Sequence, residues 1–502
     1  MESGVLQDGS GIAMEVGSLQ RLMHAMKWSM GAEVASKVIQ PLVFVILARL
    51  LSPEDFGVMA AALMVISFSQ VFWESGMGKA LIQRQGKIDK AANAAFWLNI
   101  VLGISVAAIL FYSATSIADV FFHDDRVAGI LQVMTLQVLL GALASVHVAL
   151  LQKDMRFNHL FWVRFATVSL PGLVSIPLAW GGMGYWALVA GTLLGQAAQV
   201  LVLWRISGWR PRFEFDRAVA VDLARFGVWV SLSGLLAWFY IWADSLVVGM
   251  YLGAHDLGLY RTGNQFVILV YSLVFAPLLP VLYSHFSVIQ HDTQRLNRAL
   301  DRVMRLIALL AIPVAFLLFV LSEPLAAVLF GEKWTGIGFV VGVLALAHGY
   351  AWLVGVSGEI YRAVGKPKYE SVAMLLSFAV YFPAYLVAIE SGFTEFVWTR
   401  FLLVAWGIGL HLYFLNKVAM KSVWGSAGFA VKITLASTPL LLPAMFPELM
   451  ASTDNTVIRI VAVAAVLALV FAMLRYFARE EYLYLLGLAG MHRTGEREID
   501  SR

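Results

Sequence analysis

The positive charges of this chain are segregated between alternate loops. Fourteen apolar stretches divide its 502 residues, and the hydrophilic segments around them fall into an odd-numbered and an even-numbered set. The odd set holds 27 of the 36 Lys and Arg residues, and the even set holds only Arg126, Arg261 and Lys333. Cationic loops stay in the cytoplasm when a membrane protein inserts. The pattern therefore predicts a polytopic membrane protein with both termini inside.

The apolar stretches have the length of membrane helices, which need about 20 residues to cross a bilayer. They are long continuous runs, unlike the short alternating strands of a membrane barrel. Only 14% of the residues are charged, against about 25% in a soluble domain. We expect an all-α fold with fourteen transmembrane helices, at 29–51, 56–75, 94–114, 127–151, 161–179, 185–204, 227–251, 262–284, 306–322, 337–361, 372–389, 397–415, 427–446 and 457–474.

Two short internal matches indicate a repeat. Residues 51–57 and 252–258 lie 201 positions apart and share an Asp and a Gly, and Arg156-Phe157 corresponds to Lys368-Tyr369. Six spans separate the copies, and an even number preserves their orientation, so the repeat is parallel. It predicts two six-helix lobes.

The repeat and the charge pattern together predict the organisation of the chain. Residues 19–27 read as an amphipathic helix on the membrane surface, or as solvated turns that lead into the first span. Pro171, Pro177, Pro277 and Pro280 are expected bending points or packing kinks. The parts are a cytoplasmic segment (1–28), an N-lobe (29–204), a cytoplasmic linker (205–226), a C-lobe (227–415), two appended spans (416–474) and a cytoplasmic tail (475–502).

Several motifs resemble those of a known family. They are Lys27-Trp28-Ser29, Leu47 to Leu51 with Asp55-Phe56-Gly57, Gly76 to Arg84, Leu151 to Lys153 with Arg156-Phe157-Asn158, and Phe330 to Trp334. The chain resembles Wzx-type polysaccharide flippases, within the multidrug/oligosaccharidyl-lipid/polysaccharide exporter superfamily, and is most similar to the colanic-acid-exporter branch. The resemblance implies two lobes around a central cavity. It also implies transport of an undecaprenyl-diphosphate-linked oligosaccharide across the bacterial inner membrane.

Basic residues inside the spans are candidates for binding the diphosphate, because each costs roughly 2.5–3.5 kcal/mol at the bilayer centre. Lys37 and Arg49 lie about 18 Å apart on the first span at ~1.5 Å per residue, and we interpret them as two stations for the diphosphate. Alternatively, Lys37 pairs with Glu33 and Arg49 reaches the interface. Arg164 and Arg400 are further substrate-binding candidates, although both lie near a membrane edge and can serve as anchors.

Acidic and aromatic residues supply other candidates. Asp244 is the deepest acid, and we interpret it as a proton or sodium coupling site, as the partner of a cavity arginine, or as half of a structural salt bridge. Trp238 and Trp242 share one helix face and are candidates for stacking on sugars, although interfacial belts also explain membrane tryptophans.

Basic loops are candidates for substrate entry on the cytoplasmic side. Lys79 and Arg84 follow the second span, and Arg302 follows the eighth. The orientation rule alone also accounts for these three residues.

The sequence also excludes several classes of chemistry. There is no Cys, which excludes disulfides and thiolate sites, and no GxxxxGK[ST] loop for ATP hydrolysis. We find no HExxH motif, expect no metal and no cofactor, and attribute the net charge of +4 to loops that meet anionic lipids rather than to nucleic acid.

The favoured function is a flippase with a cationic cavity and alternating access, and not an enzyme. A cation-coupled small-molecule antiporter of the same superfamily should have an acidic cavity instead. A polysaccharide polymerase should present a larger outer loop, and an assembly scaffold stays open as a second role. The expected partners are the lipid-linked oligosaccharide, membrane lipids, a polysaccharide polymerase and a chain-length regulator.

Overall fold

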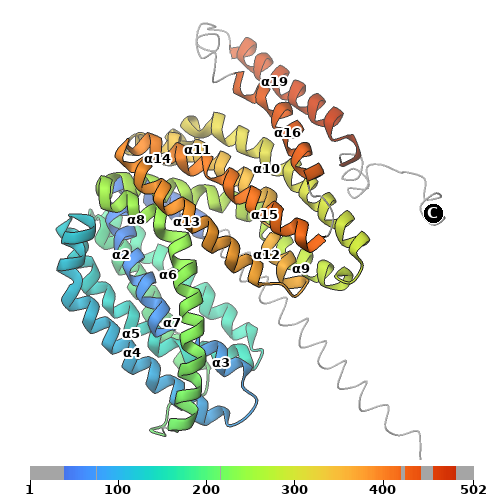
Figure 1. Cartoon of the computed structure of the whole chain (residues 1–502). Helices are drawn as coiled ribbons and strands as arrows, with labels where there is room; N and C mark the ends of the chain where they lie inside the picture. The colour runs from blue at the N-terminus through green and yellow to red at the C-terminus, as the bar shows by residue number, and fades with distance from the viewer. Residues whose placement is uncertain (1–38, 75, 215, 420–423, 443–455, 482–502) are drawn as a thin grey trace, which may run out of the picture. The chain divides into compact units, whose positions relative to one another are not determined.

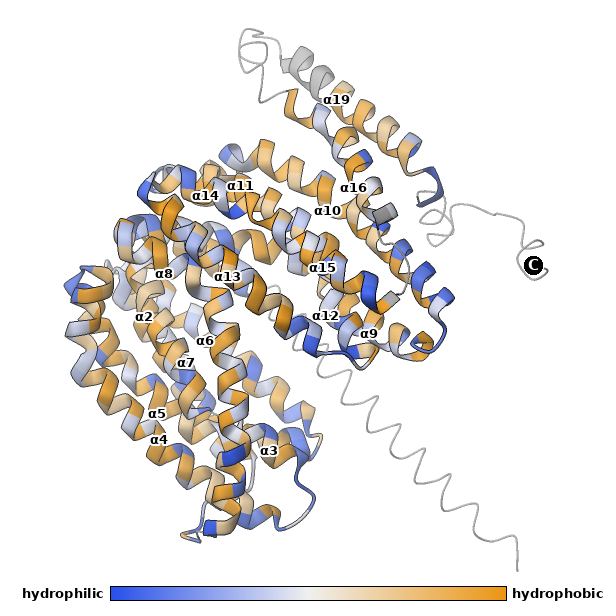
Figure 2. Cartoon of the chain, viewed as in Figure 1, coloured by the Kyte–Doolittle hydropathy of each residue, from blue (hydrophilic) through white to orange (hydrophobic). Residues whose placement is uncertain are grey.

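The computed structural model describes residues 39–74, 76–214, 216–419, 424–442 and 456–481. Within these ranges every regular element is a helix, and ten helices are long and apolar enough to cross a membrane by length and composition. Apolar residues dominate most of their length (Figure 2). The expected all-α polytopic fold is confirmed, and each of the fourteen expected spans overlaps a described helix.

The chain divides into two compact units, and the first comprises residues 1–261. A short apolar helix, Ile39–Leu50, opens its described part. The others are α2 (Pro53–Trp73), α3 (Met77–Gln83), α4 (Ile88–Ile117), the π-helix η1 (Ala118–Phe122), α5 (Asp125–Lys153), α6 (Phe157–Trp180), α7 (Tyr185–Ile206) and α8 (Arg217–Phe275), which continues into the second unit. Figure 1 shows α4 and α5 side by side.

The second unit comprises residues 262–502. Its helices after α8 are α9 (Leu278–Ile289), α10 (Thr293–Leu329), η2 (Glu332–Trp334), α11 (Ile337–Ala351), η3 (Trp352–Val354), α12 (Ser357–Ala363), α13 (Lys368–Glu390), α14 (Phe393–Leu402), α15 (Val404–Ala419), α16 (Trp424–Ser437), η4 (Thr438–Leu441) and α19 (Thr456–Phe477). The appended helix α16 packs on α10, and α19 packs on α16 (Figure 1).

Small residues allow the helices of the first unit to approach closely. Gly191 and Gly195 of α7 face α6: a Cβ at Gly191 would overlap Ser175 and the Pro171 carbonyl oxygen, and a Cβ at Gly195 would overlap the Pro171 ring. The Ser175 hydroxyl donates to the Ala187 carbonyl at 2.8 Å. Small residues at four-residue spacing typically let membrane helices pack without a hydrophobic driving force.

The helices extend beyond the apolar stretches. The segment 252–261 is expected to be a loop, but α8 contains it and deviates from helical geometry only at Gly253, with φ of +84° and ψ of −171°. This backbone region is open to glycine alone. Hydropathy places the boundary too early because it reads polar residues, here including Arg261, as loop.

The prolines expected to bend the chain have different effects within α6 and at the start of α9. Pro171 and Pro177 lie inside the continuous helix α6, whereas α8 ends at Phe275 and α9 begins after Pro277. The break follows from the missing N–H of proline and from its clash with the preceding turn.

In the structure, the two matching segments of the first repeat, 51–57 and 252–258, contact each other directly. A Cβ at Gly57 would overlap the carbonyl oxygen of Ala254, and a Cβ at Gly258 would overlap that of Pro53. Residues 53 and 57 correspond to 254 and 258 at the repeat offset of 201. The repeat therefore relates each of these two contacts to the other. Glu54 and His255 are also 201 apart, and their side chains hydrogen-bond to each other at 2.5 Å. The crossing is therefore locally two-fold symmetric.

Candidate functional site

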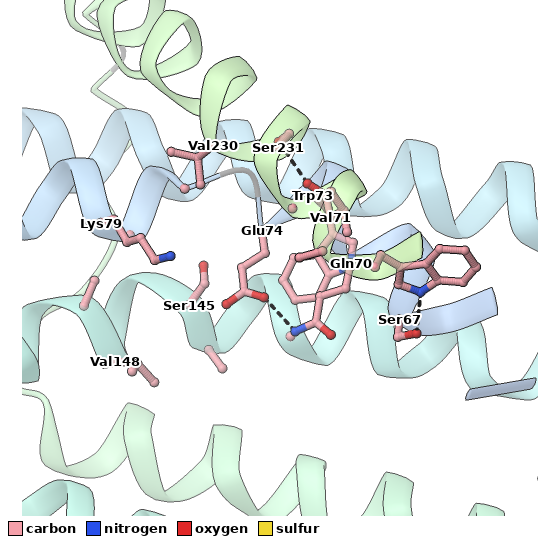
Figure 3. A pocket seen from close by; sticks show the side chains of 18 of the residues that line it. Ser67, Gln70, Val71, Trp73, Glu74, Lys79, Ser145, Val148, Val230 and Ser231 are labelled. Carbon is pink, nitrogen blue, oxygen red and sulfur yellow. Dashed lines mark hydrogen bonds between the residues drawn. The ribbon is translucent and has the colours of Figure 1, made fainter. Parts of the chain in front are cut away.

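A large cavity lies within the first unit and is the candidate site. Its volume is about 720 Å³. Side chains of α2, α3, α5, α7 and α8 form its wall, together with the turn at Gly76 between α2 and α3. Figure 3 shows the wall formed by α2, α3, α5 and α8.

Two charged residues line this cavity, among the residues that the structure describes. They are Glu74 at the end of α2 and Lys79 on α3, and Gly76, with φ of +67°, reverses the chain between them. Gln70 donates a hydrogen bond to Glu74 at 2.6 Å. Figure 3 shows both charged side chains extending into the same space.

The rest of the polar lining is neutral. Besides the indoles, it consists of amides and hydroxyls, which can both donate and accept hydrogen bonds. These side chains are Ser67, Gln70, Ser145, Gln152, Gln196, Gln199 and Ser231. Such a surface matches hydroxyl groups, which also donate and accept.

Side chains of α2 hold Trp238 in the cavity wall. Its indole N–H donates to the Ser67 hydroxyl at 2.9 Å, and its ring meets Phe68 edge to face with centroids 4.9 Å apart. The side chain is 8% exposed. Trp238 therefore presents only part of its ring to the cavity, in a fixed orientation.

Trp242 lies one helical turn further along α8 and also lines the cavity. The guanidinium of Arg261 sits over its ring, 3.8 Å from the centroid. Arg261 interacts electrostatically with Asp244, which is only 6% exposed and accepts a hydrogen bond from Tyr260 at 2.8 Å. Asp244 itself is not part of the cavity wall.

The structure distributes the other predicted substrate residues widely. Lys37 and the expected amphipathic helix lie outside the described residues. Arg49 is exposed near the end of Ile39–Leu50, Arg164 is exposed on α6, and Arg400 lies on α14 in the second unit. None of these three lines the cavity of the first unit, and their role in substrate binding stays a prediction.

Of the three entry candidates, one reaches the cavity. Lys79 lines it, whereas Arg84 forms an ion pair with Asp222 at 3.0 Å. Arg302 lines a separate pocket of about 240 Å³ between the start of α10 and Glu480 and Glu481. Its neighbour Arg305 bridges Asp301 and Glu481 there.

Sequence reasoning missed the amides and Arg261. Gln196 and Gln199 lie three residues apart in an otherwise apolar stretch, which places them on one helix face. That spacing was a usable signal, but a search for charged residues passes over it. The charge pattern predicts an outer loop for Arg261, and its approach to Trp242 depends on the kink at Gly253.

Comparison with known proteins identifies the family. The profile described as "Polysaccharide biosynthesis protein" matches residues 46–338, more than half of the chain. The chain belongs to this family, and the expected resemblance to polysaccharide flippases is confirmed.

Curated relatives are named for polysaccharide biosynthesis. The chain is 29% identical to the succinoglycan biosynthesis transport protein ExoT of Rhizobium meliloti, over 64% of this chain and 65% of that protein, slightly under two thirds of its length. It is 25% identical to the lipopolysaccharide biosynthesis protein WzxC of Escherichia coli, over 69% of each chain.

Solved structures share the fold. The lipid II flippase MurJ in an inward closed conformation superimposes with a TM-score of 0.72 at 15% identity, over 91% of this chain and 99% of that one. A multidrug resistance MATE family transporter in an inward-facing conformation gives 0.61 at 12% identity, over 77% and 96%. The chain is thus a multi-pass membrane protein with the fold of these transporters.

Proposed function

We propose that this protein is a flippase that moves an undecaprenyl-diphosphate-linked oligosaccharide across the bacterial inner membrane for exopolysaccharide or lipopolysaccharide biosynthesis. The observation that carries the proposal is the cavity of about 720 Å³, with amide, hydroxyl and indole groups inside an otherwise apolar chain. The names of the curated relatives support the same substrate class.

The cavity lining suits a sugar better than a lipid tail. Neutral amides can exchange hydrogen bonds with sugar hydroxyls, and Trp238 and Trp242 offer ring surface for their apolar faces. Desolvating a sugar headgroup without such partners is costly. The cavity therefore lowers the barrier for the polar part of the substrate, while the lipid part stays in the bilayer.

Lys79 is our candidate for the diphosphate within this unit. Its ammonium extends into the cavity and can form charge-assisted hydrogen bonds with phosphate oxygens. Lys37, Arg49, Arg164 and Arg400 remain proposed further cations of the path, and Asp244 a proposed coupling residue. The membrane potential assists export, because each negative charge leaving the cell gains roughly 2.3 kcal/mol per 100 mV.

Alternating access of the cavity to the two sides completes the proposed mechanism. The orientation with both termini in the cytoplasm places the basic loops, and thus Lys79, on the side where the substrate is made. A polymerase and a chain-length regulator are the proposed partners that would receive the product.

The leaflet position of the substrate in a strain that lacks this protein tests the proposal. Accumulation of the lipid-linked oligosaccharide on the cytoplasmic leaflet, with loss of extracellular polymer, is the expected result. Accumulation on the periplasmic leaflet would contradict the flippase and indicate a polymerase or a scaffold instead. Normal polymer with altered drug resistance would indicate a small-molecule antiporter.

A further inference from the structure

Side-chain contacts join the parts of α8 before and after its kink, beside the cavity. The backbone turns at Gly253, after which Tyr260 donates a hydrogen bond to Asp244, sixteen residues earlier in the chain. The next residue, Arg261, reaches back over the ring of Trp242. A single helix thus supplies both the cavity-lining indole and the cation that covers one of its faces.

The arginine is held in this place by its electrostatic surroundings. Asp244 is buried and accepts hydrogen bonds from the Ser245 N–H at 2.6 Å and the Ser245 hydroxyl at 3.1 Å, besides that of Tyr260. The carboxylate of Asp244 interacts electrostatically with the guanidinium of Arg261. Arg261 therefore has an electrostatic partner on one side and an aromatic ring on the other.

We infer that Arg261 is a positioning residue that holds the indole of Trp242 flat in the cavity wall, so that the ring can contact a sugar of the transported molecule. The inference rests on the proposed function. A guanidinium is planar and stacks on an aromatic ring, whereas an ammonium is a compact point charge. The stack, and not only the charge, fixes the ring.

Trp238 and Trp242 are fixed by different means. Trp238 is anchored by a hydrogen bond to Ser67 and by Phe68, both on α2. Trp242 is anchored by Arg261, beyond the kink of its own helix. A rigid aromatic surface gives more affinity than a mobile one, because less conformational freedom is lost on binding.

The position of the ring can be measured without any transport assay. We would label the full-length protein with 5-fluorotryptophan and assign the Trp242 signal in the fluorine NMR spectrum by its absence from Trp242→Phe. The signal is expected to shift and broaden in Arg261→Lys and in Arg261→Gln. Arg126→Gln is the matched control, since Arg126 pairs with Asp124 at 2.7 Å outside the cavity. A wild-type Trp242 signal in Arg261→Lys overturns the inference.

The contact with sugar needs a second readout, from purified protein in vesicles with a lipid-linked oligosaccharide. In Arg261→Lys, which keeps the charge but loses the planar stack on the ring, the substrate concentration for half-maximal transport should rise about two- to thirtyfold while the maximal rate is kept. Unchanged half-saturation overturns the role in sugar binding. If the wild-type protein itself transports nothing, the proposed function fails, and the NMR result still decides whether Arg261 positions Trp242.

Discussion

At the scale of single residues, the cavity combines few charges with many neutral polar groups. Glu74 and Lys79 are the charged residues of the described lining, and amides, hydroxyls and indoles make up the remaining polar wall. This balance separates two tasks. Under the proposed function, the neutral groups recognise a sugar without the desolvation cost of a buried charge, and the single ammonium is left for the phosphates.

Replacing Lys79 by Gln should reduce polymer export by about tenfold, because one charge-assisted hydrogen bond contributes roughly 1.5–3 kcal/mol. Export would be measured in the deletion strain complemented with the variant, at matched protein levels. Lys90→Gln is the control, since Lys90 is exposed at the start of α4 and does not line the cavity. Equal export by both variants would reject the role of Lys79.

Some of these residues could be predicted from the sequence alone. Trp238 and Trp242 share one helix face within an expected span, Lys79 lies in a basic loop beside another span, and the structure places all three in the cavity wall. Gln196 and Gln199 carry a weaker signal. Arg261 could not be placed, because its contact with Trp242 depends on how the chain turns at Gly253.

At the scale of elements, the crossing between the start of α2 and the part of α8 after the kink depends on two glycines. The backbone carbonyls of Ala254 and Pro53 occupy the space where a Cβ of Gly57 or Gly258 would lie. A backbone atom cannot move aside like a flexible side chain, so any larger residue forces the two helices apart.

Gly57→Ala and Gly258→Ala should each destabilise the protein, by about 1–3 kcal/mol as for other overpacked sites. Because the two contacts are images of each other, we expect similar losses in thermal unfolding of the purified protein. The double variant should lose less than the sum, since the first methyl already separates the helices.

Gly129→Ala is the control for these two variants. Gly129 lies in α5, and an added Cβ would meet no atom within 4 Å apart from its chain neighbours and the nearby backbone of its own helix. Alanine has the higher helix propensity, so this variant should be neutral or slightly stabilising. Glycine variants at the crossing that unfold like Gly129→Ala would show that the close approach is not needed for stability.

The repeat was visible in the sequence, but its structural meaning was not. The matching segments 51–57 and 252–258 predict equivalent folds, and no rule of sequence predicts that equivalent segments contact each other. Element boundaries were also hard to predict: Ser52 caps α2 through a capping box with Asp55, inside a segment that hydropathy reads as loop.

At the scale of the whole molecule, the charge pattern predicts the orientation in the membrane. The chain has no Cys, so single cysteines can be introduced without background. In spheroplasts, whose intact inner membrane is accessible from outside, a membrane-impermeant thiol reagent should label Ser391→Cys, which lies in an expected outer segment. Gln85→Cys, in an expected cytoplasmic segment, should be labelled only after the membrane is permeabilised. Both positions are exposed. The reverse labelling would overturn the orientation.

Flipping by the purified protein tests the central claim most directly. The protein would be reconstituted into vesicles that contain an undecaprenyl-diphosphate-linked oligosaccharide, and the fraction of headgroups reaching the opposite leaflet would be followed with an impermeant sugar-modifying reagent. The account predicts protein-dependent movement that Lys79→Gln slows and Lys90→Gln leaves unchanged. Headgroup movement at the rate of protein-free vesicles would contradict it.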